Sequence, residues 1–306
     1  MKSDYAKTQS RLSLGDLELL LALVRGGTLA GAAQRLSLDT STVFRSIKRL
    51  EKNLNEHLFE RSKKGYMPTE LAQELAAYAE RIDSHLNEAR DKVAHNSGEP
   101  SGSLRISTTD TILQGLLLPV LGRFATAYPK IDLELIFTNT LANLSKRDAD
   151  IAVRATRKPP QELVGMKLGV MENAVYIHRS LLPAGRRRLD LSGLDAGGID
   201  WITLDESLSN HPSYQWWRQH YPKARSRFRC NSVMSVGGAI VNGLGVGVAP
   251  RFLMDAHPEV VAISGTLEDL KTDLWILAHP DIRHLQRVKL LFDFLKENIR
   301  LQPKSQ

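Results

Sequence analysis

Hydroxyl and cationic side chains recur at helical spacing along residues 40–52, where Ser41, Arg45, Lys48 and Lys52 fall on one stripe. Apolar residues occupy the opposite stripe of the same segment, which predicts an amphipathic helix. Guanidinium, ammonium and hydroxyl groups held outward on one helix can contact base edges and phosphates in the major groove of DNA. The pattern therefore indicates nucleic-acid binding.

The neighbouring segments predict the elements that would present this helix. Ser13 can cap a helix that ends at Gly26 and Gly27, Thr28 can cap a second short helix, and Asp39 stands at the N-cap of the third. After the third helix, LFERSKKGYMPTE contains a Ser-Lys-Lys-Gly turn between two short extended pieces. Together these elements predict a winged helix-turn-helix with a basic wing over residues 1–68.

Side chains on the second helix, the third helix and the wing are predicted to contact DNA. They are Thr28, Thr40, Ser41, Thr42, Phe44, Arg45, Lys48, Arg49, Lys52, Arg61, Lys63 and Lys64. Arg45 contacts either a base or a phosphate, whereas the lysines favour phosphates. Phe44 either meets a thymine methyl group or packs against the first helices. Arg61 can instead form a surface ion pair with Glu60 or Glu51.

A long helix is predicted over residues 69–95, with Thr69 as its cap and one apolar stripe. A single stripe with no domain around it needs a partner, and a second copy of the helix is the simplest partner. The predicted dimerisation residues are Leu71, Leu75, Tyr78, Ile82, Leu86, Ala89 and Val93. A polar segment rich in Gly, Ser and Pro, residues 96–103, is predicted to be a hinge.

Beyond the hinge, short β-type runs alternate with helical ones from residue 104 to residue 300. This alternation predicts parallel strands with crossover helices in an α/β domain. The aromatic segment with Trp216, Trp217 and Tyr221 fits one amphipathic helix, and packing explains it better than ligand recognition. The glycines of GGAIVNGLG lack the GxGxxG order and its preceding strand, so a dinucleotide site is not predicted.

Composition bounds the class of protein. The formal net charge of +7 weakly favours polyanionic partners. The single cysteine, Cys230, excludes an internal disulfide, fits a reducing cytoplasm and is predicted to be a small buried residue. No apolar run approaches the roughly 20 residues of a membrane span. No metal-ligand cluster or catalytic constellation stands at a recognisable spacing, so the chain is predicted to use no cofactor or metal and not to be an enzyme.

The chain resembles the LysR-type transcriptional regulators over nearly its full length. The N-terminal likeness lies in AAQRL, SIKRLEKNL and HLFERSKKGYMPTELA. The C-terminal likeness lies in GSLRIS, LLLPVLGRFATAYPKIDLEL, DADIAVR, VNGLGVGVAP and DLWILAHPDIRHLQRVKLLFDFL, all in the family's order. The chain departs from the family where it usually carries Ser-Gln-Pro, because Asp39, Thr40 and Ser41 stand there, and Phe44 replaces a frequent serine. The base preference is therefore expected to differ.

The resemblance implies an α+β multidomain fold: a winged helix-turn-helix, a linker helix that pairs subunits, and a two-lobed α/β effector domain like type 2 periplasmic binding proteins. One lobe is expected at about 104–168 plus 271–300, and the other at about 169–270. Ligands of such domains bind outside the carboxyl ends of strands. The predicted effector contacts are Thr108, Thr109, Thr111, Thr140, Arg154, Asp205 and Ser235. Each also has an ordinary role, since Thr and Ser cap helices and Arg154 can pair with Asp148 or Asp150.

The expected function is a sequence-specific DNA-binding regulator of transcription that senses a small metabolite. Its expected partners are double-stranded DNA with an interrupted palindrome, an effector, the transcription machinery, and itself as a homodimer or homotetramer, with no membrane. Two rivals are a small-molecule binding module without a regulatory role and a cytosolic enzyme. The helices of the first third and the lack of a signal peptide favour the regulator.

Overall fold

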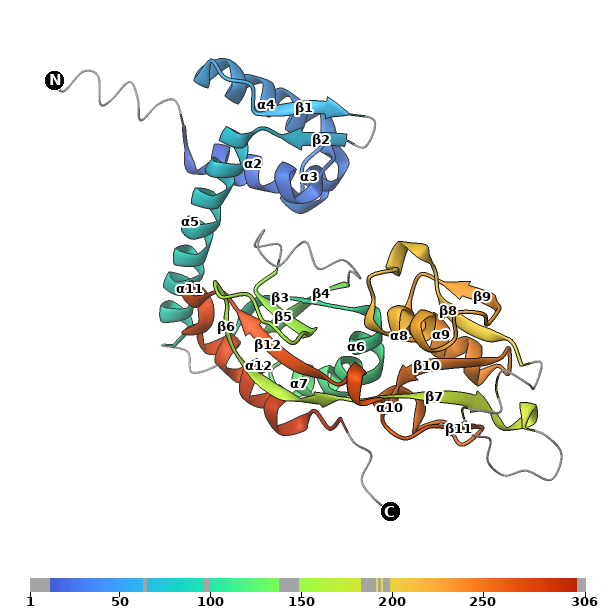
Figure 1. The fold of residues 1–306 in the computed structure, drawn as a ribbon. Coiled ribbons are helices and arrows are strands. Elements are labelled where there is room, and N and C mark those ends of the chain that lie inside the picture. Colours follow the sequence, from blue (N-terminus) through green and yellow to red (C-terminus); the bar gives the residue numbers. More distant parts are fainter. Residues whose placement is uncertain are drawn as a thin grey trace, which may run out of the picture. The chain divides into compact units, whose positions relative to one another are not determined.

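The computed structural model of the chain describes the residues 12–62, 65–95, 100–137, 149–182, 191, 194 and 199–301. The chain forms two compact units, Met1–Ser97 and Gly98–Gln306. The first unit is mainly helical, and the second contains two five-stranded sheets (Figure 1). Each unit is described by itself.

Three helices form the body of the N-terminal unit: α2 (Leu14–Gly26), α3 (Leu29–Leu36) and α4 (Thr40–Leu54). The predicted caps at Ser13 and Thr28 are confirmed. The Ser13 hydroxyl accepts the Asp16 amide at 3.2 Å and the Asp16 carboxylate accepts the Ser13 amide at 3.0 Å, which forms a capping box. The cap at Asp39 differs from the prediction, because its backbone begins α4 but its side chain accepts no cap hydrogen bond.

The wing packs closely on the turn between α2 and α3. Strands β1 (Phe59–Ser62) and β2 (Gly65–Pro68) pair antiparallel, and the Tyr66 amide donates to the Gly27 carbonyl at 2.8 Å. Gly65 has φ +125°, and a Cβ atom there would lie 2.2 Å from the Gly27 carbonyl oxygen. Only glycine fits this position, since it needs both a positive φ and a close backbone approach.

Helix α5 (Glu70–His95) leaves the wing with Thr69 as its cap. Among the α5 side chains that the structure describes, the buried ones are the small Ala72, Ala76 and Ala79, which pack into the core of the unit. The predicted dimerisation residues Leu71, Leu75 and Ile82 are half-buried against that same core, so their role is not confined to a subunit contact. Tyr78 and Ala89 are exposed, Leu86 is half-buried, and the Val93 side chain lies outside the described residues.

The first sheet of the C-terminal unit has the strand order β4-β3-β5-β12-β6. Its strands are β3 (Gly102–Thr108), β4 (Ile131–Phe137), β5 (Ile151–Ala155), β6 (Val164–Met171) and β12 (Thr272–Ala278). The prediction of parallel strands is correct for β3 with β4 and β5, but wrong for β12, which pairs antiparallel with both neighbours. β12 returns from the far end of the chain without a crossover helix, so local alternation carries no signal for it.

The second sheet has the strand order β11-β7-β10-β8-β9. Its strands are β7 (Asn173–His178), β8 (Trp201–Leu204), β9 (Ser226–Cys230), β10 (Val246–Pro250) and β11 (Val260–Ala262). This sheet is also mixed: β8 lies parallel to β9 and β10, whereas β7 lies antiparallel to β10 and β11. The first sheet with its helices is called lobe I below, and the second is called lobe II.

Helices cover the sheets and complete the cores. In lobe I these are α6 (Asp110–Ile112), the π-helix η1 (Leu113–Leu117), α7 (Leu118–Ala127), α11 (Pro280–Arg283) and α12 (Gln286–Asn298). In lobe II they are α8 (Pro212–His220), α9 (Val233–Val241), α10 (Arg251–Met254) and the 3-10 turns η3 (Arg179–Leu181), η5 (Glu206–Leu208) and η6 (Glu268–Leu270). Helix α8 packs against one cluster of buried strand residues and α9 against another.

The aromatic helix α8 packs as predicted. Trp216, Trp217 and Tyr221 are all buried, and their rings form one cluster with Trp201 of β8. Cys230 was predicted to be a small buried residue. It does pack against an apolar cluster of lobe II, but it is half-buried and not fully buried. Burial and the nearby Asp205 carboxylate raise the pKa of the Cys230 thiol, which opposes thiolate chemistry.

Candidate nucleic-acid interface and effector site

Helix α4 presents a polar, positively charged face, and its apolar residues hold that face outward. Val43, Ile47 and Leu50 are at most 2% exposed in the core of the N-terminal unit. The predicted contacts on the outer side of α4 are all exposed: Thr40, Ser41, Phe44, Arg45, Lys48, Arg49 and Lys52. Thr42 is half-buried between the two faces.

Three cations on this face are held by neighbouring groups. Arg45 donates its Nε to the Ser41 carbonyl at 3.2 Å. Lys48 pairs with Glu51 at 2.8 Å. Arg49 lies 3.7 Å from Asp16 of α2, with its side chain 67% exposed. Each cation keeps donors exposed to solvent, so the partners orient these side chains without removing them from reach of a phosphate or base.

Phe44 and Thr28 differ in how they are placed. Phe44 is 41% exposed and is absent from the described core of the unit, so packing against the first helices does not account for it. Thr28 uses its hydroxyl to cap α3, where it accepts the Gly31 amide at 3.0 Å. The Thr28 oxygen therefore has a structural role that the prediction gave only as one possibility.

Glu51 is a site residue that the sequence analysis missed in this role. It is 6% exposed, and its Oε1 accepts the backbone amides of Leu58 at 3.0 Å and Phe59 at 3.2 Å. The buried carboxylate therefore connects α4 to the start of the wing while its Oε2 holds Lys48. Arg61 of β1 is exposed, and the predicted pair of Arg61 with Glu51 is not the one the structure has. Lys63 and Lys64 lie outside the described residues.

In lobe I, the three described threonines of the predicted effector site use their hydroxyl groups in hydrogen bonds within the lobe. Thr108 is fully buried and donates to the Val153 carbonyl at 2.9 Å. Thr109 caps α6, and Thr111 donates to the Asp110 carboxylate at 3.1 Å. All three therefore have structural roles at the carboxyl end of β3. Thr140 lies outside the described residues.

Arg154 is a buried cation near the same strand ends. It is 4% exposed and donates an Nη2 hydrogen bond to the Ser107 hydroxyl at 2.8 Å. Burial lowers the pKa of Arg154 to about 10, because the surroundings solvate the charged form poorly. Asp150, one of its predicted partners, accepts the Arg105 backbone amide at 2.8 Å.

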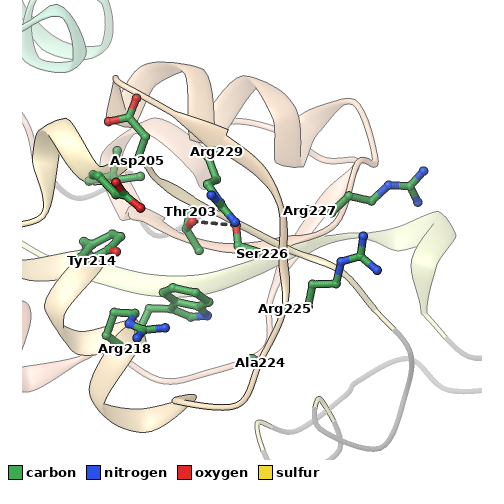
Figure 2. Close-up of a pocket in the computed structure, with 12 residues that line it drawn as sticks. Thr203, Asp205, Tyr214, Arg218, Ala224, Arg225, Ser226, Arg227 and Arg229 are labelled. Atoms are coloured by element: carbon green, nitrogen blue, oxygen red, sulfur yellow. Dashed lines mark hydrogen bonds between the residues drawn. The ribbon is translucent and has the colours of Figure 1, made fainter.

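In lobe II, the two predicted effector contacts, Ser235 and Asp205, have different surroundings. Ser235 is exposed in the first turn of α9, and its backbone amide donates to Ser232 at 3.2 Å. Asp205 caps η5 and lines an open pocket of about 620 Å³ built by lobe II alone. Figure 2 shows this pocket, with Arg227 and Arg229 on the edge strand β9 and Arg225 directly before that strand.

The polar groups that join the two lobes were also missed. The Ser232 hydroxyl, at the N-cap of α9, donates a hydrogen bond to the Asp110 carboxylate at the start of α6. The predicted effector contacts include the threonines on both sides of Asp110 but not Asp110 itself. The two partners are 122 residues apart in the chain, so no local pattern could pair them.

Other kinds of site find little support within the described part of the chain. No three His, Cys, Asp or Glu side chains there are grouped so that they could hold a metal ion. Among the helices described, none combines the length and the apolar character that crossing a membrane requires.

A winged helix-turn-helix with an exposed cationic helix, followed by a two-lobed α/β domain, defines a DNA-binding regulator with a ligand-binding domain. Comparison with known families agrees. Residues 14–73 match the bacterial regulatory helix-turn-helix protein model of the lysR family, and residues 97–300 match the LysR substrate binding domain. The chain belongs to the LysR family, whose members are transcriptional regulators and not enzymes.

Individual relatives support the same assignment. The regulator PtxR of Pseudomonas aeruginosa is 25% identical over 301 residues, which cover 96% of this chain and 95% of PtxR. A full-length OxyR variant from Pseudomonas aeruginosa has the same fold, with a TM-score of 0.64 at 18% identity, covering 96% of this chain and 99% of that one. Full-length LysG from Corynebacterium glutamicum, solved with its bound effector arginine, matches with a TM-score of 0.59 at 21% identity. The match covers 94% of this chain and 98% of LysG.

Proposed function

We propose that the chain binds an interrupted palindrome in double-stranded DNA through the outer face of α4 and the wing. The observation that carries the proposal is the exposure of Arg45, Lys48 and Lys52 on one face of α4. The opposite face is held in the core by its buried residues Val43, Ile47 and Leu50. Helices presented in this way enter the major groove, and two copies read two half-sites. The basic wing would add phosphate contacts from Arg61, Lys63 and Lys64.

Paired copies of the chain supply the two-fold symmetry that a palindrome requires. Helix α5 supports this part of the proposal, because Tyr78 is 57% exposed and Ala89 is exposed too, on the apolar stripe that contains the half-buried Leu75 and Ile82. A second α5 would cover this ring. The paired unit is proposed to be a homodimer or a homotetramer that contacts the transcription machinery at the promoter.

The C-terminal unit is proposed to sense a small metabolite at the boundary between its lobes. The support is the arrangement of the first turns of α6 and α9, which meet there through Asp110 and Ser232. The solved LysG structure with its bound arginine shows that a protein of this fold takes a small effector. A ligand alters promoter contacts only if it binds one arrangement of the subunits better than another.

The DNA contacts are tested by selecting bound sequences from a random pool and measuring their affinities over a range of salt concentrations. We expect Arg45→Ala to weaken binding to the selected site by a factor that depends on the base at one position, because a bidentate base contact is worth about 1–3 kcal/mol. Lys52→Ala should weaken selected and random DNA equally and reduce the salt slope by about 1. Equal losses on both DNAs for Arg45→Ala would remove it from base recognition.

A further inference from the structure

A hydrogen bond to a charged side chain joins the two lobes of the C-terminal unit where α6 and α9 begin. The acceptor is Asp110, the first residue of α6 in lobe I, and the donor is the Ser232 hydroxyl at the start of α9 in lobe II. The backbone of lobe I also lies close to a side chain of lobe II nearby, since a Cβ atom at Gly115 would lie 2.5 Å from the Phe252 ring. The lobes are therefore in direct contact at this point.

Both partners are fixed by further bonds. Asp110 Oδ1 accepts the Thr111 amide at 2.7 Å and the Thr111 hydroxyl at 3.1 Å, while its Oδ2 accepts Ser232. The Ser232 oxygen in turn accepts the Ser235 amide at 3.2 Å. The carboxylate is thus held beside the first turn of α9, where the positive end of the helix dipole stabilises a negative charge.

The other polar groups near this boundary are less able to interact with a ligand. Thr108 and Arg154 are 0% and 4% exposed, and both bond within lobe I. The Ser232 hydroxyl donates to Asp110 and accepts from Ser235. Asp110 is only half-buried, so among the described residues discussed here it is the charged side chain that keeps some exposure at this boundary.

We propose that Asp110 is the residue that determines which class of effector binds at the lobe boundary. Its carboxylate closes the two lobes through Ser232 and excludes acidic effectors, because a second carboxylate beside it would be repelled in a partly desolvated place. The effector it accepts carries a hydrogen-bond donor toward it, above all an ammonium group. The proposal rests on the proposed function of the boundary as the effector site.

The closing contact is tested without any ligand, by hydrogen exchange of the full-length chain. Asp110→Ala should raise exchange several-fold at the first turn of α9, although Asp110 belongs to the other lobe. Asp293→Ala is the matched control, since Asp293 is an exposed acid on α12 of lobe I. Unchanged exchange in α9 after Asp110→Ala would overturn the contact as a closing device.

Effector class is tested by measuring the affinities of acetate and methylammonium for the full-length chain. We expect Asp110→Asn to bind acetate at least tenfold more tightly than the wild type, and methylammonium at least tenfold more weakly, with no change for Asp293→Asn. An unchanged ratio of the two affinities, including no binding of either probe, would overturn the proposal. DNA affinity and its salt slope in the same samples test the proposed DNA-binding function separately, since Asp110 lies in the other unit.

Discussion

Removing the Glu51 carboxylate should lower the free energy of unfolding of the N-terminal unit and leave that of the C-terminal unit unchanged. Glu51 Oε1 accepts the amides of Leu58 and Phe59, whose residues are 0% and 7% exposed. Glu51→Ala leaves both buried amides without their acceptor. Each unsatisfied buried donor costs about 1–3 kcal/mol, so we expect the two amides together to cost about 2–6 kcal/mol. For a unit of this size that lowers the Tm by about 10 °C or more.

The lowered pKa of Glu51 also predicts the direction in which stability changes with pH. Burial alone would raise the Glu51 pKa. The hydrogen bonds from Lys48 and from the two backbone amides lower the pKa by more than burial raises it, so the Glu51 pKa lies below its ordinary value. A lowered pKa in the folded state gives stability that is complete above the ordinary carboxyl pKa and is lost as pH falls through the lowered one. The difference between wild type and Glu51→Ala should therefore narrow as the solution is acidified.

The tryptophans provide the internal control for this experiment. All four lie at or beyond residue 201, so their fluorescence follows the C-terminal unit, whereas circular dichroism at 222 nm also follows the helices of the N-terminal unit. We expect Glu51→Ala to move the dichroism transition and leave the fluorescence transition in place. Glu51→Gln keeps an acceptor oxygen and should lose less. Equal losses for both substitutions, or a shift of both signals together, would refute the reasoning.

Two further predictions concern other parts of the chain. Burial lowers the pKa of His211, whose Nδ1 accepts the Ser213 amide at the start of α8, so this stabilisation is present above the ordinary histidine pKa and is lost as pH falls below it. Unfolding followed by tryptophan fluorescence should show that the free energy of unfolding falls as pH is lowered from 7.5 to 5.5. His211→Asn, which can still cap the helix, should make this fall shallower. An equally steep fall in His211→Asn would contradict the prediction. Tyr78→Glu should dissociate paired chains in sedimentation, whereas Ala77→Glu, exposed on α5 but off the apolar stripe, should not; an unchanged mass for Tyr78→Glu would remove α5 pairing at this residue.

The predictions from sequence held where the signal is local. The spacing of Val43, Ile47 and Leu50 identifies the buried side of α4, because successive turns of a helix repeat every 3.6 residues. The caps at Ser13 and Thr28 depend on hydrogen bonds across three residues, so a short motif contains both partners. Such features need no knowledge of the rest of the chain.

Contacts between distant segments escaped the prediction. The edge strands β6 and β9 were not predicted, because two glycines interrupt VGMKLGVM and SRFRC is a short run with only two apolar residues, Phe228 and Cys230. Asp110 with Ser232 depends on the final packing of two lobes. Glu51 was noticed only as a surface partner, because nothing local shows that the amides of Leu58 and Phe59 would need its oxygen.

The position of β12 has a consequence for how the protein is made. This strand lies between β5 and β6 in lobe I, yet the whole of lobe II precedes it in the chain. During synthesis, lobe II can therefore assemble from a continuous segment. Strand β6 cannot pair with β12 until residues 272–278 have left the ribosome. Premature termination before Thr272 would leave lobe I with a gap in the middle of its sheet and expose the inner edges of two strands to aggregation.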